Sequence, residues 1–457
     1  MTHEGTYAQL ISELSFIFPG AKSLTPSNRN ISDLRASVNV KHTKSNLIWI
    51  HSEKVMHVFL SQGNGMQLNI ATTFQPLQYP TDFDIRLTNA YVRLFQEDCL
   101  CAPDRSRHKE LWETLTFSRI PRTIARITSF TTANFLDWLT VMESATHLKY
   151  EGRSFQSIAI MSKQAQTVTE RVDNGYLKLK FAVPFRKALL NQKWIRAISH
   201  SSDIALHGVG HSGEIQGIVD LSAKTKGRAK HVHKRNQIYN PELKFTLPSK
   251  LKNITRFIVD GTVAFVCAAN GDLYLILPSG ICFLRTQGRW HYLNFASFEL
   301  LLSNHISKTI TPSLLSLLLD LSFDRKGALI CILSDAGVIK SVVPDYGLKG
   351  VPNYELRCAI AGSKIDNPDI RHILKAAATV DGSMIIRNDG TIVDVACMIG
   401  EPSIEVLRDS GLSRLERFDG ARSTAAWNAS MHGISIKISE DGPISVFLKG
   451  KLLGQLG

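Results

Sequence analysis

An almost wholly apolar segment that begins near residue 311 constrains the fold of this 457-residue chain more than any other feature. Thr311-Pro312 is typical of a helix start, and the leucine-rich residues that follow predict a helix to about Leu321. A helix that is apolar nearly all round must be buried. The segment is too short to span a membrane and carries Asp320, so the surrounding chain has to supply a core that covers it.

The residues after this helix predict a mixed sheet flanked by helices. The expected strands are Ala328 to Leu333, Met384 to Arg387, Thr391 to Met398, Ile434 to Ile438 and Ile444 to Leu448. The expected helices are one opened by Asn367-Pro368-Asp369 and one from Ala421 to Met431.

The middle of the chain is predicted to be rich in antiparallel sheet. A helix from Thr132 to about His147 precedes strand-like runs at Ser157 to Met161, Thr167 to Val172 and Tyr176 to Val183. Asp173-Asn174-Gly175 and Asn270-Gly271 are strong hairpin signals, the second between runs at Thr262 to Ala268 and Leu273 to Leu277. The first 130 residues indicate only an α+β region.

A net charge of +13 favours an anionic partner, either a nucleotide or a nucleic acid. The densest basic segment, Lys224 to Arg235, has no aromatic residue until Tyr239, so it lacks the stacking residues of a single-strand binder. We interpret it as a solvated basic loop. Nucleic-acid binding stays an alternative without direct support.

Two short segments suit a nucleotide site on physical grounds. Asp381-Gly382-Ser383 sits at a strand start, where a carboxylate beside a glycine can hold a divalent cation, although such a pair is more often a plain turn. Gly420-Ala421-Arg422-Ser423-Thr424 opens a helix, where free NH groups, a guanidinium and two hydroxyls can converge on phosphate oxygens. The alternative there is a capped helix with an exposed arginine.

Four motifs of the last third of the chain, from about Thr311 to Gly457, point to a known domain. They read Arg325-Lys-Gly-Ala-Leu-Ile330, Asp381-Gly-Ser383, Gly420-Ala-Arg-Ser-Thr-Ala-Ala426 and Ile438-Ser-Glu-Asp-Gly-Pro-Ile-Ser445. In order and content they resemble (R/K)-x-G-A-L-I, D-G-A, G-T-R-H-R-A-A and V-S-E-E-x-G-x-I-S of the bacterial diadenylate-cyclase domain, which occurs in the DNA-integrity scanning protein and its relatives. Upstream, Leu148–Arg153 and Gly288–Trp290 loosely resemble sensor modules that accompany this domain.

The resemblance implies a nucleotidyltransferase that makes the second messenger cyclic di-AMP and pyrophosphate from two ATP molecules. Two domains would meet face to face as a homodimer, and each ribose 3′-hydroxyl would attack the α-phosphorus of the other ATP. Asp381 and Arg422 would be catalytic, with Mg²⁺ or Mn²⁺ bound by Asp381 and assisted by Glu440. The nucleotide would be bound by Gly382, Ser383, Gly420, Ala421, Arg422, Ser423 and Thr424.

This chain departs from the family where phosphate charge must be offset. The family's Arg-His-Arg reads Arg422-Ser423-Thr424, which removes an imidazole and a guanidinium. A neutral donor is worth roughly half a charge-assisted one, so we expect nucleotide binding to survive better than turnover. The alternative to an active cyclase is therefore a nucleotide-binding sensor with little or no turnover.

The predicted fold class is α/β in the α+β arrangement, in three domains. These are an α+β region of unknown role at 1–130, a β-rich sensor module at 131–305 and the diadenylate-cyclase-like domain at 306–457. Met1 to Leu10 lacks a signal-peptide pattern and no apolar run is long enough to span a membrane, so we expect a cytoplasmic protein without a membrane partner.

Other catalytic and metal motifs are disfavoured. His207, His211, His231 and His233 lack an acidic or cysteine partner at zinc-ligand spacing. No G-x-x-x-x-G-K-[ST] loop and no G-x-S-x-G elbow occurs, so a P-loop ATPase and an α/β hydrolase are not expected.

Overall fold

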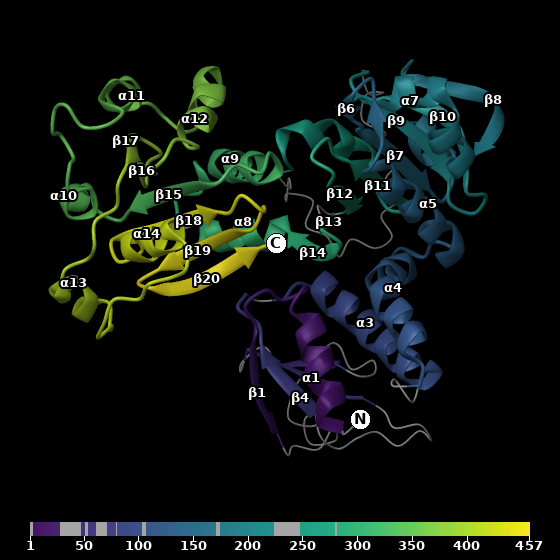
Figure 1. Cartoon of the computed structure of the whole chain (residues 1–457), viewed down its shortest axis with the longest axis horizontal. Helices are drawn as coiled ribbons and strands as arrows, with labels where there is room; N and C mark the ends of the chain where they lie inside the picture. Colours follow the sequence, from purple (N-terminus) through teal and green to yellow (C-terminus); the bar gives the residue numbers. More distant parts are fainter. Residues whose placement is uncertain are drawn as a thin grey trace. The chain divides into compact units, whose positions relative to one another are not determined.

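The computed structural model describes residues 3–27, 47–50, 54–60, 71–78, 80–102, 107–170, 174–223, 247–278 and 281–457 (Figure 1). By its contacts the chain divides into unit 1, residues 1–243 and 253–293, and unit 2, residues 244–252 and 294–457. Both units combine helices with sheets, so the α+β class is confirmed. The domain boundaries after residues 130 and 305 stay predictions.

Unit 1 begins with a small antiparallel sheet and four helices. The strand order is β1-β4-β3-β2. The strands are β1 (Lys22–Ser27), β2 (Leu47–Ile50), β3 (Val55–Val58) and β4 (Ala71–Gln75). The helices are α1 (His3–Leu14), α3 (Asp82–Cys101), α4 (Lys109–Thr128) and α5 (Thr132–Ala145). The predicted helix from Thr132 is thus confirmed as α5.

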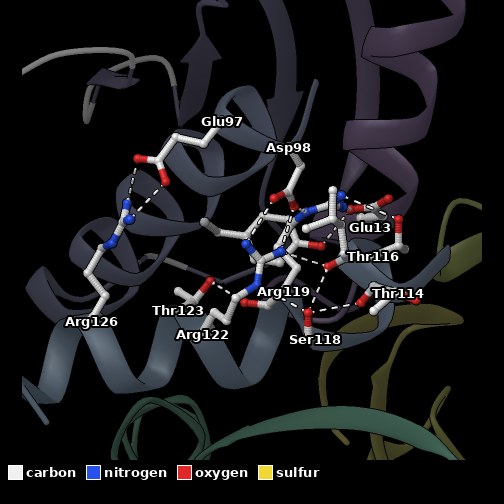
Figure 2. A network of polar contacts seen from close by, with 12 residues as sticks. Glu13, Glu97, Asp98, Thr114, Thr116, Ser118, Arg119, Arg122, Thr123 and Arg126 are labelled. Atoms are coloured by element: carbon white, nitrogen blue, oxygen red, sulfur yellow. Dashed lines mark hydrogen bonds and ion pairs between the residues drawn. The ribbon is translucent and has the colours of Figure 1, made fainter. Parts of the chain in front are cut away.

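A buried ionic network joins α1, α3 and α4 (Figure 2). Arg119 on α4 is fully buried, pairs with Glu13 and donates to Asp98 at 2.7 Å. Arg122 donates to both oxygens of Asp98, at 2.9 and 2.8 Å. The rings of Phe95 and Trp112 lie 4.8 and 5.1 Å from the Arg119 guanidinium carbon. The side chain is therefore satisfied by charge and enclosed by aromatic surface.

The larger sheet of unit 1 has the strand order β14-β13-β12-β11-β7-β9-β10-β8. Its strands are β7 (Ser157–Ser162), β8 (Tyr176–Pro184), β9 (Ile204–Val209), β10 (Glu214–Asp220), β11 (Thr262–Cys267), β12 (Leu273–Leu277), β13 (Ile281–Thr286) and β14 (Arg289–Asn294). The smaller elements are β5 (Lys149–Tyr150), β6 (Arg153–Ser154), α6 (Gln166–Thr169), the π-helix η1 (Lys187–Asn191) and α7 (Lys193–Ser199).

One of the two predicted hairpins is confirmed. Strands β11 and β12 pair antiparallel around Asn270-Gly271, and Gly271 has the positive φ that such a turn needs. The strand predicted at Thr167 to Val172 is wrong, because Gln166–Thr169 forms the helical turn α6 and buries Val168. Burial of one side chain there overrides the strand preference of Thr and Val. Strand β8 pairs with β10, and Asp173 lies outside the described residues.

Unit 2 contains a six-stranded sheet of order β17-β16-β15-β18-β19-β20, in which only β15 and β16 pair in parallel among the described pairs. The strands are β15 (Ala328–Leu333), β16 (Ser383–Arg387), β17 (Ile392–Cys397), β18 (Gly433–Ile438), β19 (Ile444–Leu448) and β20 (Lys451–Leu456). The helical elements are α8 (Phe295–Ser303), α9 (Thr311–Phe323), η4 (Ala336–Val338), α10 (Ile339–Val342), α11 (Tyr354–Ile360), η5 (Pro368–Ile370), α12 (Arg371–Ala377), α13 (Ile404–Asp409) and α14 (Ala421–Ala429).

Helices cover this sheet as the sequence predicts. Figure 1 shows α9 on one side and α14 on the other side of β15 and β18. Leu329, Cys331 and Leu333 of β15 form a core with Ala426 and Ala429 of α14. The predicted buried helix is confirmed, with its leucines in the core and proline in its first turn. Strand β20 was not predicted.

Two carboxylates at the C-terminal end of α9, Asp320 within the helix and its C-cap residue Asp324, bind a segment that precedes the helix by about 60 residues. Asp320 accepts hydrogen bonds from the backbone and side chain of Ser249, at 2.6 and 2.7 Å. Asp324 pairs with Lys250 at 3.0 Å. Ser249 and Lys250 begin the 3-10 helix η2 (Ser249–Phe257) and belong to unit 2, so this short stretch packs on α9. Among the described helices, none is both long and apolar enough to cross a membrane.

Candidate functional site

The registers of three strands bring the predicted site segments to one edge of the sheet in unit 2. Ile330 of β15 lies beside Met384 of β16, and Ala328 lies beside Ile438 of β18. Gly327 immediately precedes β15, Ser439 immediately follows β18, and Asp381 comes two residues before β16, so the three segments lead to or from the same ends of these strands. Glu440 lies at this end of β15, next to Gly327.

Gly327 also lies against the first turn of α14. A Cβ built on Gly327 would collide with the guanidinium of Arg422 and lie 2.8 Å from Cγ of Glu440. Only a residue without a side chain leaves this space to the arginine. The glycine of the Arg325–Ile330 motif therefore makes room for the arginine of the Gly420–Ala426 motif.

Arg422 and Glu440 form an ion pair at this edge, with 3.2 Å between Nη1 and Oε1. The Arg422 side chain is 31% exposed and the Glu440 side chain 75% exposed. An exposed pair of this kind is worth about 0–1 kcal/mol, since both charges remain largely solvated. A stronger anion can therefore displace Glu440 from Arg422 at little cost.

The two hydroxyls that follow Arg422 already have partners inside the chain. Ser423 Oγ accepts a hydrogen bond from Nζ of Lys437 at 2.8 Å. Thr424 Oγ1 accepts from the backbone NH of Phe418 at 3.0 Å and donates to the Phe418 carbonyl at 3.3 Å. Thr424 thus fixes the loop before α14, while Gly420 and Ala421 are exposed at the helix start.

The Asp381-Gly382-Ser383 segment is held against β17. Gly382 has φ +115°, and a Cβ there would lie 2.6 Å from the carbonyl carbon of Ala396, so only glycine fits. The buried Ser383 donates its hydroxyl to the carbonyl of Cys397 at 2.9 Å. Asp381 is exposed and makes no hydrogen bond or ion pair to another described residue. Its carboxylate is therefore free to bind a cation.

The donor set suits a metal ion held jointly with a substrate. Among the described residues, no group of three or more His, Cys, Asp or Glu side chains is placed to hold a metal. Mg²⁺ is commonly bound by one or two carboxylates together with substrate phosphates and water. Asp381 fits that role, and Glu440 fits it once released from Arg422.

The histidines considered for zinc do not assemble among the described residues. His207 is buried, with Ser162 Oγ 2.8 Å from Nε2 and the Tyr176 hydroxyl 2.9 Å from Nδ1. Burial lowers the pKa of His207 to about 4, so the ring is neutral. His211 is exposed. His231, His233 and the basic segment Lys224 to Arg235 lie outside the described residues.

The sequence analysis missed Lys437. On β18, Ser435 and Lys437 face α14, where the Ser435 hydroxyl donates to the carbonyl of Ala426. They alternate with Ile434, Ile436 and Ile438, which are buried. This period-two pattern signals a strand whose polar side chains point to one face, and it was readable from the sequence.

Comparison with known proteins adds no assignment. No protein-family model matches the chain, and no curated protein matches it. One solved structure with some similarity is the crystal structure of the hypothetical membrane spanning protein from Bacillus cereus, at 16% identity, covering 35% of this chain and 69% of that chain. Its TM-score is 0.25, so the likeness carries no argument about function.

Proposed function

We propose that unit 2 binds ATP and condenses two ATP molecules into cyclic di-AMP and pyrophosphate across a face-to-face homodimer. The observation that carries the proposal is the meeting of Arg422 and Glu440 against Gly327, which brings three separate motifs together at one end of β15, while the fourth motif, Asp381-Gly382-Ser383, leads into the neighbouring strand β16. Unit 1 would contain the sensor region that regulates this reaction. We place the protein in the cytoplasm, where ATP is available.

The proposed reaction needs positioning and charge neutralisation rather than a protein nucleophile. Each 3′-hydroxyl forms a bond to the α-phosphorus of the other ATP, and the bond to pyrophosphate breaks. Arg422 and the free NH groups at the start of α14 would bind phosphate oxygens. Asp381 would orient the 3′-hydroxyl and accept its proton. A bound Mg²⁺ or Mn²⁺ would supply further neutralisation of phosphate charge.

The test incubates the purified full chain with ATP and Mg²⁺ or Mn²⁺ and measures cyclic di-AMP by mass spectrometry. We expect product from the wild type and none from Asp381→Asn or Arg422→Ala. Asp409→Asn and Arg408→Ala are matched controls, since both residues are exposed on α13 and change the net charge equally. Product that survives in Asp381→Asn, or is lost equally in the controls, would contradict the assignment.

The second candidate is a nucleotide sensor with little or no turnover. It is favoured by the hydrogen bonds that engage Ser423 and Thr424 within the chain, in place of two cationic side chains of the family motif. ATP binding without product under either metal would select this function. Asp381→Asn would then leave ATP affinity within a few-fold of wild type.

A further inference from the structure

We infer that Lys437 is a second phosphate-binding cation of this site and that it grips the polyphosphate of the nucleotide together with Arg422. This inference rests on the proposed function and extends it to a residue outside the four motifs. No part of the resemblance assigns a role to position 437.

The position of Lys437 follows from the packing of α14 on β18. The Ser435 hydroxyl donates to the carbonyl of Ala426, which fixes the helix on the strand. Two residues further along the same strand face, Nζ of Lys437 reaches Ser423 Oγ at 2.8 Å. Ser423 directly follows Arg422, so the ammonium lies at the first turn of α14, the same turn that carries Arg422.

No described carboxylate neutralises the charge of Lys437. Among the described residues no carboxylate pairs with Lys437, and the first turn of α14 contains no acidic residue. A helix N-terminus carries a positive partial charge, so a cation there is unfavourable. Two cations at this helix end destabilise the fold slightly. An anion bound between them would offset this unfavourable electrostatic energy.

The geometry also leaves donors for that anion. An ammonium has three N–H donors, and the bond to Ser423 uses one of them. The side chain is half-buried, so the remaining donors are reachable from solvent. Lys437 thus brings a positive charge from the neighbouring strand to the side chain of Ser423. Phosphate oxygens match this compact point charge.

The experiment measures the affinity of the full chain for ATP, ADP and adenosine by calorimetry. For Lys437→Met we expect ATP affinity to fall about 10-fold and adenosine affinity to stay unchanged, because one charge-assisted hydrogen bond is lost. Lys437→Arg should bind ATP within about threefold of wild type. Lys349→Met, an exposed lysine in the loop between α10 and α11, controls for net charge and should bind as wild type.

Each outcome decides the inference. Wild type that binds ATP with Lys437→Met binding equally well overturns the role of Lys437 and leaves the proposed function standing. A wild type that binds no ATP overturns both. If Lys437→Met weakened the binding of ATP and of adenosine to the same extent, or lowered Tm by a large amount, the lysine would have a structural role. Either result would also overturn the inference.

Discussion

Two arginines, Arg119 in unit 1 and Arg422 in unit 2, both pair with a glutamate, but their surroundings differ. Arg119 is fully buried among carboxylates and aromatic rings. Arg422 is partly exposed at the start of α14 and pairs with one exposed carboxylate, that of Glu440. Because the Arg119 side chain is fully buried and already paired, it serves structure. The pair at Arg422 can exchange its partner, which is what a binding site requires.

The largest expected effect is on the stability of unit 1. Arg119→Met should lower the free energy of unfolding by about 3–5 kcal/mol, because Glu13 would lose its arginine and Asp98 would keep only Arg122 as a cationic partner. Arg126→Met is the matched control. Arg126 pairs with Glu97 at 2.8 Å with both side chains about half exposed, so its loss should cost about 1 kcal/mol or less. Urea unfolding of the full chain measures both, and equal losses would remove the distinction between buried and exposed pairs.

Acidification should destabilise unit 1 through His207. The folded-state pKa lies near 4, below the ordinary 6.5, so the unfolded chain binds the proton more readily. The contribution of the neutral ring is full above pH 6.5 and is lost as the pH falls toward 4, by up to about 3 kcal/mol. Comparing the pH dependence of unfolding with that of His207→Gln isolates this residue from the carboxylates. Identical pH profiles would contradict the assignment.

Arg422→Ala should change stability little and binding strongly. Its ion pair is solvated, so the free energy of unfolding should fall by about 1 kcal/mol or less, while ATP affinity falls at least about 10-fold. Unfolding and calorimetry on the same sample measure the two effects. A loss of stability as large as that of Arg119→Met would show that Arg422 is a structural residue.

Glu440→Gln should have the smallest effect on stability, within about 0.5 kcal/mol, because Glu440 is mostly exposed. Removing the partner of Arg422 should leave ATP affinity unchanged or raise it by up to about threefold. Product formation should fall, since Glu440 is proposed to assist the metal. Weaker ATP binding would mean that Glu440 helps to orient Arg422 for the nucleotide.

The sequence predicted the elements of unit 2 better than the contacts of its site. Helix α9 and strand β15 of unit 2 follow from continuous apolar character, and the β11–β12 hairpin of unit 1 follows from its Asn-Gly turn. The strand prediction at Thr167 to Val172 was wrong because Gln166–Thr169 forms a helical turn that buries Val168. Local preference is a weak guide wherever a single buried side chain decides the backbone.

The partners of the site side chains depend on strand register and helix packing, which the sequence does not state. Asp381, Arg422 and Glu440 were predicted as site residues, but not that Arg422 pairs with Glu440 or that Ser383 bonds to Cys397. The Lys437 contact with Ser423 requires both the orientation of β18 and the placement of α14. Residues distant in sequence come into contact only after the strand register and the helix packing are established.

The route of the chain has a practical consequence for dissecting the protein. Because Ser249 and Lys250 belong to unit 2 while the residues that follow return to unit 1, no single cleavage point separates the two units. A fragment that begins at residue 306 would lack α8 and would leave the buried carboxylate of Asp320 without its two donors from Ser249. Expression of unit 2 alone therefore requires that the 247–252 segment be supplied as well, for example by grafting it ahead of residue 294.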